Sequence, residues 1–340
     1  MEYRRLGHSG LHVSSICLGT MMFGVQTDEA TSKRIIDKAA DEGVNFIDTA
    51  DVYGKGASEE VVGRSLAGKR DAWVLATKVA NSMGDDPNRG GLGRKWIMRA
   101  CEESLTRLGT DYIDIYYLHK EDLGTPLEET VSAIGDLMKS GKVRHFGLSN
   151  HRSWRVAEVA RICDSMGVDR PIVSQPYYNA LNRMPEVEHL PACDHYGMGV
   201  VPYSPLARGV LTGKYGPADL QAPKEGTRAS RSDPRMMQTE WRIESLEIAE
   251  KLKAHCDAKG AKLSHFAVGW VCNNALITCP IAGPRTEEQW DDYMAALDYE
   301  FTAEDEALLN DLVTIGHPST PGYNDPAYAI EGRVALTDFD

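Results

Sequence analysis

Four side chains of complementary chemistry follow three apolar segments of the chain. Asp48 lies at the end of the segment NFIDTA, Tyr53 follows shortly after it, Lys78 ends WVLATK, and His119 ends YIDIYYLH. A tyrosine hydroxyl, with a pKa of about 10, is a weak acid at neutral pH. A neighbouring lysine ammonium lowers that pKa, and an aspartate stabilises the lysine. These residue types predict a proton donor, Tyr53, with His119 placed to hydrogen-bond and orient a carbonyl group.

These side chains can meet only if the segments that carry them lie side by side. Eight short apolar segments, rich in β-branched and aromatic residues, are predicted as strands that are covered on both faces. They are residues 14–19, 45–50, 73–78, 112–119, 143–150, 171–178, 199–206 and 277–283. Helical patterns follow at 29–42, 94–108, 125–141, 153–166, 241–259 and 286–297, with a further helix at about 303–315.

The helix at 125–141 has the clearest pattern of end signals. Thr125 and Glu128 have the spacing of a capping box, and Pro126 is expected at the first helical position. Gly141 is expected to end the helix.

Eight strand-then-helix units in a row predict an α/β fold of the (β/α)8 barrel type, a TIM barrel. An open doubly wound sheet is the alternative, but no GxGxxG follows a strand, and the glycines of 88–95 are expected to form a loop. The segment 3–14 is predicted as a β-hairpin that closes the bottom of the barrel. We expect one domain over 1–340, with 317–340 as a C-terminal tail and a long functional insertion at about 207–240.

In such a barrel the reactive face is formed by the carboxyl ends of the strands. Taken singly, an aspartate at a strand end is most often a turn former, and a lone lysine, tyrosine or histidine is most often structural. Asp51, which lies between Asp48 and Tyr53, is expected to be a turn or loop residue near the mouth of the pocket. The predicted rim consists of Gly19, Thr20, Asp48, Lys78, His119, Ser149, Asn150, Gln175, Tyr203, Ser204 and Gly283.

Composition limits the classes of partner. The 340 residues include 37 Lys and Arg against 50 Asp and Glu, a formal net charge of −13, so general binding to nucleic acid or to an anionic membrane is not expected. The seven cysteines contain no CxxC pair, which indicates reduced thiols. No apolar run is long enough for a signal peptide or a membrane span, so we expect a cytoplasmic protein. No metal site and no oligomeric state are predicted.

The chain resembles the aldo-keto reductase superfamily, whose members are NAD(P)H-dependent carbonyl reductases on a (β/α)8 barrel. The resemblance extends from the segment YRRLGHSGLHVSSICLGTMMFG to the helix near 315. It is carried by the motifs GVNFIDTADVYGKGASEEVVGRSL, LATK, LTRLGTDYIDIYYLH, SGKVRHFGLSN, QPYYNALNR, YSPLARGVLTGKY and GPRTEEQ. The family's catalytic tetrad corresponds to Asp48, Tyr53, Lys78 and His119, with Tyr53 as general acid in reduction and general base in oxidation.

The resemblance also implies a set of cofactor contacts. It assigns the nicotinamide carboxamide to Ser149, Asn150 and Gln175, and stacking on the nicotinamide ring to Tyr203. The pyrophosphate region and the start of the cleft are assigned to Ser204, Leu206, Gly209, Lys214, Gly19, Thr20 and Met21, with Gly283 nearby.

The preferred cofactor is expected to be NADPH rather than NADH. Thr286 and Gln289 have the spacing of a capping box, which places Arg285 at a helix N-terminus, a position suited to anions. The resemblance assigns this segment to the adenosine 2′-phosphate. Two residues depart from the family pattern: Tyr293 stands where many relatives have asparagine, and Asp292 is an acid near the proposed phosphate site.

The expected function is reduction of aldehydes or ketones to alcohols by hydride transfer, with bulky cyclic ketones, keto-sugars or xenobiotic carbonyls as candidate substrates. Lys120 and Glu121 follow His119 where several branches of the family have tryptophan, which favours a more polar pocket. Tyr323 or Tyr328 of the tail are candidates for an apolar wall. One alternative is a cofactor-binding regulatory module with little turnover. A second is a barrel hydrolase or lyase, which leaves Lys78 without a role.

Overall fold

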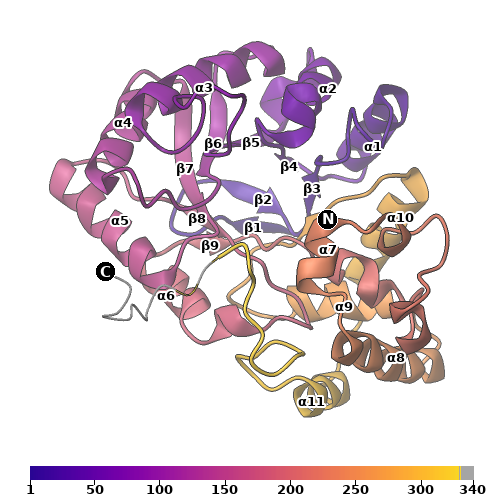
Figure 1. The fold of residues 1–340 in the computed structure, drawn as a ribbon. Helices are drawn as coiled ribbons and strands as arrows, with labels where there is room; N and C mark the ends of the chain where they lie inside the picture. The colour runs from indigo at the N-terminus through magenta and orange to yellow at the C-terminus, as the bar shows by residue number, and fades with distance from the viewer. Residues whose placement is uncertain (329, 331–340) are drawn as a thin grey trace.

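The strands of the protein form one curled parallel sheet. The computed structural model describes residues 1–328 and residue 330. Eight strands run in the order β10-β3-β4-β5-β6-β7-β8-β9, and Figure 1 shows helices arranged around them. This is the predicted α/β barrel, with every predicted strand present. The strands are β3 (Cys17–Gly19), β4 (Phe46–Asp48), β5 (Val74–Val79), β6 (Ile113–Leu118), β7 (Val143–Ser149), β8 (Val173–Gln175), β9 (Gly199–Val200) and β10 (Ile281–Ala282).

Backbone hydrogen bonds beyond the short last strands close the barrel. The Thr278 amide donates to the Val200 carbonyl at 2.8 Å, and the Ile281 amide donates to the Pro202 carbonyl at 2.9 Å. The predicted hairpin is present as β1 (Tyr3–Arg5) and β2 (His12–Ser14). It lies against the strand starts, because a side chain at Gly7 would meet the Gly199 nitrogen at 2.6 Å. The hairpin therefore covers the end of the barrel opposite the strand exits.

The predicted helices are present; those at 94–108 and 153–166 have the predicted ends, and the ends of the others differ by up to three residues. They are α1 (Glu29–Asp41), α3 (Arg94–Leu108), α4 (Leu127–Lys139), α5 (Ser153–Met166), α8 (Ile243–Ala258), α10 (Glu287–Ala295) and α11 (Ala303–Leu312). Four further helices were not predicted: α2 (Ala57–Leu66), α6 (His189–His195), α7 (Pro234–Thr239) and α9 (Leu263–Cys272).

The predicted capping box of α4 is wrong. Pro126 is the N-cap rather than the first helical residue, and no side chain caps this end of α4. The Thr125 hydroxyl instead donates to Asp122 at 2.7 Å. The end of the helix is as expected, because Gly141 follows it with φ of 76°, a left-handed conformation that glycine adopts readily.

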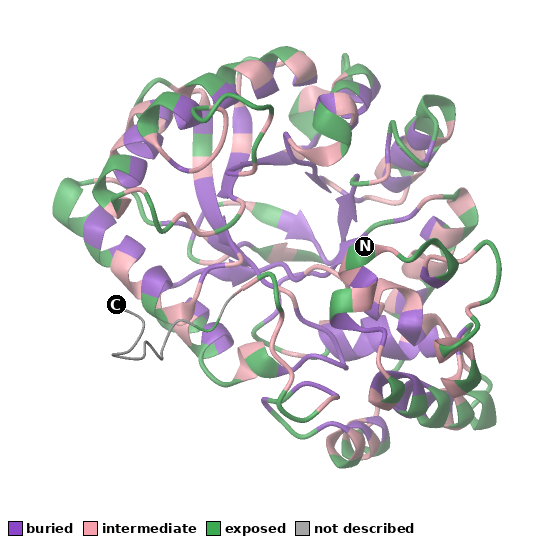
Figure 2. Ribbon diagram, viewed as in Figure 1, coloured by how far each residue is buried: buried purple, intermediate pink, exposed green. Residues whose placement is uncertain are grey.

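Apolar side chains fill the barrel on both sides of its wall. One buried cluster lies inside and includes Phe46, Ile115 and Val173, whereas a larger one lies between the strands and the helices. Figure 2 shows the strands almost entirely buried and the helices exposed on their outer faces. Burial on both faces explains why the strands are continuous apolar runs in the sequence.

The long segment after β9 contains short helices. It includes η4 (Ala207–Thr212), η5 (Pro217–Leu220), η6 (Ala229–Arg231) and α7. Of the predicted tail, residues 329 and 331–340 lie outside the described residues. The described part docks on α7, where the Tyr323 hydroxyl donates to the Gln238 carbonyl at 3.1 Å, and on α8, where the hydroxyls of Ser319 and Ser245 lie 2.9 Å apart.

The residues that the structure describes lack two features. None of their helices is long and apolar enough to cross a membrane. They also contain no group of three or more His, Cys, Asp or Glu side chains that could hold a metal ion.

Candidate active site

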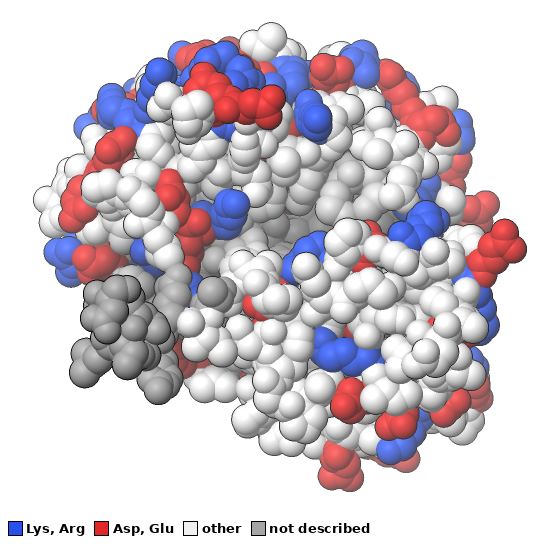
Figure 3. All heavy atoms as spheres, in the orientation of Figure 1, with Lys and Arg blue, Asp and Glu red and all other residues white. Residues whose placement is uncertain are grey.

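A cavity of about 580 Å³ opens at the carboxyl ends of the strands. Figure 3 shows this hollow, with basic side chains on both sides of it. The strand register brings rim residues together: Gly19 pairs with Asp48, and Ser149 pairs with Gln175. Of the predicted site residues, Lys78 alone is not in the lining. The others that line the cavity are Gly19, Thr20, Met21, Asp48, Tyr53, His119, Ser149, Asn150, Gln175, Tyr203, Ser204, Leu206, Gly209, Lys214, Gly283, Arg285 and Gln289.

A continuous chain of polar contacts joins three of the four predicted tetrad residues. Lys78 is fully buried beneath the cavity and forms an ion pair with Asp48. The Lys78 ammonium also donates to the Thr49 carbonyl at 2.8 Å and to the Tyr53 hydroxyl at 3.2 Å. The second carboxylate oxygen of Asp48 accepts a hydrogen bond from the Gln175 amide at 2.9 Å. The lysine is thus held against the phenol, and the aspartate that pairs with it is itself held by Gln175.

The balance of burial and charge keeps protons on both Lys78 and Tyr53. Burial by itself lowers the pKa of Lys78, but the charges and hydrogen bonds of Asp48 and Tyr53 together outweigh it, and the net pKa is raised. Burial raises the pKa of Tyr53, and the opposing charge of Lys78 only partly offsets this. We expected a lowered pKa for Tyr53. In the structure Lys78 does act in that direction, but desolvation of the phenolate is the larger effect.

A tight turn after β4 aims Tyr53 into the cavity. Gly54, Lys55 and Gly56 all have positive φ values, of 59°, 56° and 101°. Glycine is favoured at Gly54 by its left-handed conformation, and a side chain there would also meet the exposed side chain of Val25 at 2.6 Å. This turn leads directly into α2, which buries Val61 and Val62 against the barrel. The turn explains how a strand residue and a phenol a few positions later reach the same site.

His119 faces Tyr53 and contacts Asn81, which is not among the predicted site residues. The two rings meet edge to face, with centroids 5.9 Å apart. The side-chain nitrogen of Asn81 lies 3.1 Å from Nδ1 of His119. Burial, with the charges of Lys78 and Lys120, lowers the pKa of His119 well below its usual value. The imidazole is therefore neutral, and a hydrogen bond donated by Asn81 to Nδ1 leaves the ring proton on Nε2.

Polar groups assigned to the nicotinamide form a second network. Asn150, with φ of 55°, donates to the His119 carbonyl at 2.9 Å and to the Ser149 hydroxyl at 3.0 Å. The Asn150 amide oxygen accepts from the Tyr203 hydroxyl at 2.8 Å. Tyr203 stacks on Tyr177, with ring centroids 5.6 Å apart. These contacts fix the orientation of each group, and the amide oxygen of Asn150 retains a second lone pair for a ligand.

Four cations gather at the cavity end formed by the long segment and the start of α10. Partial burial and the positive charges of Arg285, Arg228 and Arg231 lower the pKa of Lys214. A cluster of this kind favours a phosphate-bearing ligand. Among the described residues Lys214 makes no ion pair, whereas Arg228 pairs with Asp233 at 3.1 Å.

The start of α10 has the expected cap with one difference. The Thr286 hydroxyl accepts from the Gln289 amide at 3.3 Å, but the Gln289 side chain accepts from the backbone of Arg285 at 2.9 Å rather than from that of Thr286. Asp292 does not leave an isolated negative charge in the cavity, because its carboxylate accepts hydrogen bonds from Lys262 and Ser264, both at 2.7 Å.

The expectation that Asp51 lies near the pocket mouth is wrong. Its side chain is 1% exposed, and neither carboxylate oxygen has a hydrogen-bond partner among the described residues. Burial and the nearby charge of Glu59 raise the pKa of Asp51 to about 7. The turn that exposes Tyr53 to the cavity directs Asp51 into the protein.

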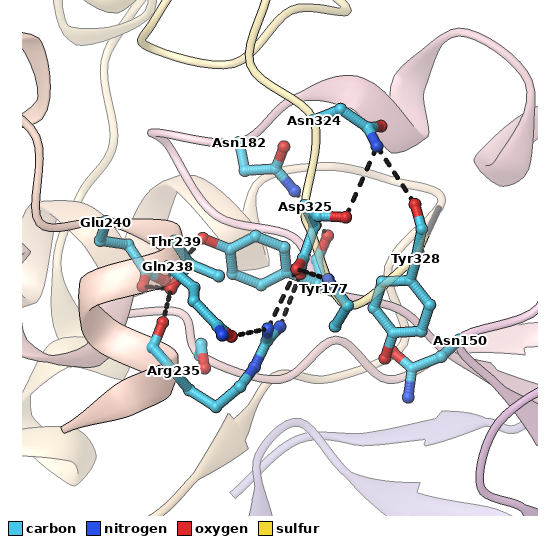
Figure 4. A network of polar contacts seen from close by, with 12 residues as sticks. Asn150, Tyr177, Asn182, Arg235, Gln238, Thr239, Glu240, Asn324, Asp325 and Tyr328 are labelled. Carbon is cyan, nitrogen blue, oxygen red and sulfur yellow. Dashed lines mark hydrogen bonds and ion pairs between the residues drawn. The ribbon is translucent and has the colours of Figure 1, made fainter. Parts of the chain in front are cut away.

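A segment far along the chain completes the cavity wall. Figure 4 shows Tyr328 beside Asn150 and the carboxylate of Asp325 against Arg235 of α7. The two hydrogen bonds from Arg235 to Asp325 measure 3.0 and 2.6 Å, and Asn324 donates to the Tyr328 carbonyl at 3.1 Å. Of the two tail tyrosines predicted as candidates for the cavity wall, Tyr328 lines the cavity and Tyr323 does not.

Comparisons with known proteins find relatives that match most of the chain. A sequence model of the aldo/keto reductase family matches residues 15–314. An uncharacterized oxidoreductase, YrpG, of Bacillus subtilis is 39% identical over 343 aligned positions, which cover 97% of this chain and 100% of that protein. A probable voltage-gated potassium channel subunit beta of Arabidopsis thaliana is 36% identical, covering 88% and 92%. An L-glyceraldehyde 3-phosphate reductase of Escherichia coli is 32% identical, covering 87% and 88%.

Proposed function

The chain belongs to the aldo/keto reductase family, and on that premise we propose that it is an NADPH-dependent reductase of aldehydes and ketones. The observation that carries the proposal is the contact chain from Asp48 through Lys78 to Tyr53, which ends in a protonated phenol at the wall of the cavity. Within this proposal the whole chain, 1–340, works as one domain.

The residues around the cavity fit a phosphorylated nicotinamide cofactor. Lys214 and Arg285 supply positive charge at one end of the cavity, and Ser149 and Asn150 supply hydrogen-bonding groups near Tyr53 at the other. Because Arg285 precedes a helix N-terminus, we propose that it favours the 2′-phosphate of NADPH over NADH. When bound, this cofactor supplies the hydride.

Each side chain of the tetrad then has a distinct role in the reaction. His119 donates a hydrogen bond from Nε2 to the substrate carbonyl oxygen and orients it. Tyr53 gives its proton to the same oxygen as negative charge develops there. Lys78 stabilises the phenolate that remains, and Asp48 keeps Lys78 charged and in place. In the direction of alcohol oxidation the phenolate accepts the proton back. Bulky cyclic ketones, keto-sugars and xenobiotic carbonyls are the candidate substrates.

A regulatory module with little turnover is the second candidate. The similarity to proteins named as potassium channel beta subunits favours it. The complete tetrad favours the enzyme, because a module that only senses cofactor does not need a proton donor beside the carbonyl site.

Replacing Tyr53 with Phe tests the proposal. The variant keeps the aromatic ring and loses the proton, so we expect kcat to fall by at least two orders of magnitude while NADPH affinity stays within about twofold. The measurement is NADPH consumption with a panel of aldehydes and ketones, run in parallel with NADH, and cofactor binding by fluorescence. Full activity of Tyr53→Phe would contradict the assignment of the acid. Tight NADPH binding without turnover of any carbonyl by the wild type would favour the regulatory module.

A further inference from the structure

Lys120 places a positive charge on the substrate side of the cavity, away from the cations assigned to the cofactor. It directly follows His119, and its exposed side chain lines both the active-site cavity and an adjoining recess formed by residues 80–96 and 120–129. Its charge is close enough to His119 to lower the pKa of the imidazole. The cation therefore lies near the group that binds the carbonyl oxygen.

The acids that follow Lys120 in sequence are occupied by other partners. The Glu121 carboxylate accepts from the backbone of Arg152 at 2.6 Å and from its guanidinium at 2.8 Å, and its side chain is only 8% exposed. Asp122 accepts from the Leu92 amide at 2.7 Å and from the Gly124 amide at 2.9 Å. Neither acid neutralises Lys120.

Two other cations of the cavity wall differ from Lys120 in this respect. Arg208 forms an ion pair with Glu240 at 3.0 Å, and Arg235 forms one with Asp325 at 2.6 Å. Lys120 makes no ion pair and no side-chain hydrogen bond with any of residues 1–328 or 330. In a chain with a net charge of −13, an exposed cation that stays without a counter-ion inside a functional cavity is available for an anion supplied by the ligand.

We infer that Lys120 recognises an anionic group on the carbonyl substrate, so that the preferred substrates are oxo-acids or aldehyde phosphates. This inference rests on the proposed carbonyl reduction and specifies its substrate class. The shared chemistry is a carboxylate or phosphate in the same small molecule as the carbonyl. Lys120 attracts the anion and holds it, while His119 binds the carbonyl oxygen.

Matched substrate pairs test this inference. We would compare 4-oxobutanoate with its methyl ester, and glycolaldehyde phosphate with glycolaldehyde, and measure kcat/KM for each with saturating NADPH. The wild type should prefer the anionic member of at least one pair. A larger ratio for the carboxylate pair identifies oxo-acids, and a larger ratio for the phosphate pair identifies aldehyde phosphates.

Two variants separate Lys120 from a general effect of surface charge. Lys120→Gln should lower the anionic-to-neutral ratio of kcat/KM by about two- to fivefold, the effect of losing one exposed ion pair. The control is Lys95→Gln, because Lys95 lines the adjoining recess but not the active-site cavity. The ratio should also fall with added salt in the wild type more than in Lys120→Gln.

The inference would be overturned if the anionic-to-neutral ratio of kcat/KM were the same in the wild type and in Lys120→Gln. It would also be overturned if Lys120→Gln and Lys95→Gln lowered this ratio equally. Either result would leave carbonyl reduction intact. If no carbonyl in either pair is reduced, calorimetry can compare the binding of butanoate and of butanamide to the NADPH complex. This comparison tests anion recognition without turnover. Butanoate binding that is lost in Lys120→Gln would support anion recognition even if the proposed reduction fails. Absence of any preference for butanoate would reject it.

Discussion

Replacing Asn81 with aspartate tests how His119 presents its proton to the substrate. The two side chains have nearly the same shape, but Asn81→Asp exchanges an amide donor, 3.1 Å from Nδ1 of His119, for a carboxylate acceptor. In the wild type the Asn81 amide donates to Nδ1 and the proton lies on Nε2. In the variant the new carboxylate accepts a hydrogen bond from a protonated Nδ1, so the neutral imidazole turns a lone pair on Nε2 towards the carbonyl oxygen. The ring can then no longer donate a hydrogen bond to the substrate.

The size of the effect follows from the contacts of His119. Removing one hydrogen-bond donor from an oxygen that gains negative charge typically lowers kcat by about 10²–10³-fold. Burial, Lys78 and Lys120 keep the wild-type imidazole neutral, so the wild type gains nothing from mild acid. A carboxylate in contact with Nδ1 acts in the opposite direction and raises the pKa of His119. As the pH falls, the imidazolium forms and Nε2 regains a proton, so the loss in kcat should shrink.

The assay is kcat with saturating NADPH and carbonyl substrate from about pH 5.5 to about pH 9, normalised to the wild type at each pH. Asn81→Ala is the control, because it removes the donor without adding a charge and should show a smaller loss that does not depend on pH. Nitrogen NMR of the imidazole gives a readout independent of activity. A wild-type spectrum with the proton on Nδ1, or a variant as active as the wild type at high pH, would refute the reasoning.

Two further predictions concern the buried carboxyl of Asp51 and the tail contact of Asp325. The pKa of Asp51 is about 7 in the folded protein, above the ordinary value of 3.8, so its contribution to stability is lost as the pH rises through this range. From about pH 5 to about pH 8 the free energy of unfolding should fall by roughly 3 kcal/mol. In Asp51→Asn, urea unfolding should no longer show this dependence on pH. An unchanged pH dependence in the variant would contradict the prediction. Asp325→Asn breaks the paired contact with Arg235 that holds the segment of Tyr328, so the KM for the carbonyl should rise several-fold with little change in kcat, measured by steady-state kinetics. An unchanged KM would show that Tyr328 is held by other contacts.

The barrel could be predicted from the sequence because its strands are buried on both faces. Continuous apolar runs that end in polar residues mark each strand and its exit, so the positions of Asp48, Lys78 and His119 at one rim follow from the repeat alone. The helix α9 was not predicted, for a related reason. It is buried around most of its circumference, from Leu263 to Val271, and therefore lacks the apolar and polar faces by which a helix is usually recognised.

Contacts that depend on loops and turns, or that join residues far apart in the sequence, could not be predicted in the same way. The bond of Asn81 to His119 depends on a loop beyond β5 that no periodicity describes. The contact of Arg235 with Asp325 joins residues 90 positions apart, and each is unremarkable in its own segment. Asp51 was placed on the wrong side because it lies inside a turn, closed by a hydrogen bond from the Tyr53 amide to the Ala50 carbonyl at 3.1 Å, that no periodicity describes.

On the mechanism proposed above, the protonation state of Tyr53 suits the cavity to carbonyl reduction. A lysine beside a phenol ordinarily favours loss of the phenolic proton, but the Lys78 charge is shared among Asp48, the Thr49 carbonyl and the Tyr53 hydroxyl. Burial therefore dominates and the pKa of Tyr53 is raised, so the phenol is protonated when a substrate arrives. A developing negative charge on the carbonyl oxygen changes this balance, because Lys78 then stabilises the phenolate as the proton leaves. Burial thus keeps Tyr53 protonated before the reaction, and on the proposed mechanism the charge of Lys78 assists its ionisation during the reaction.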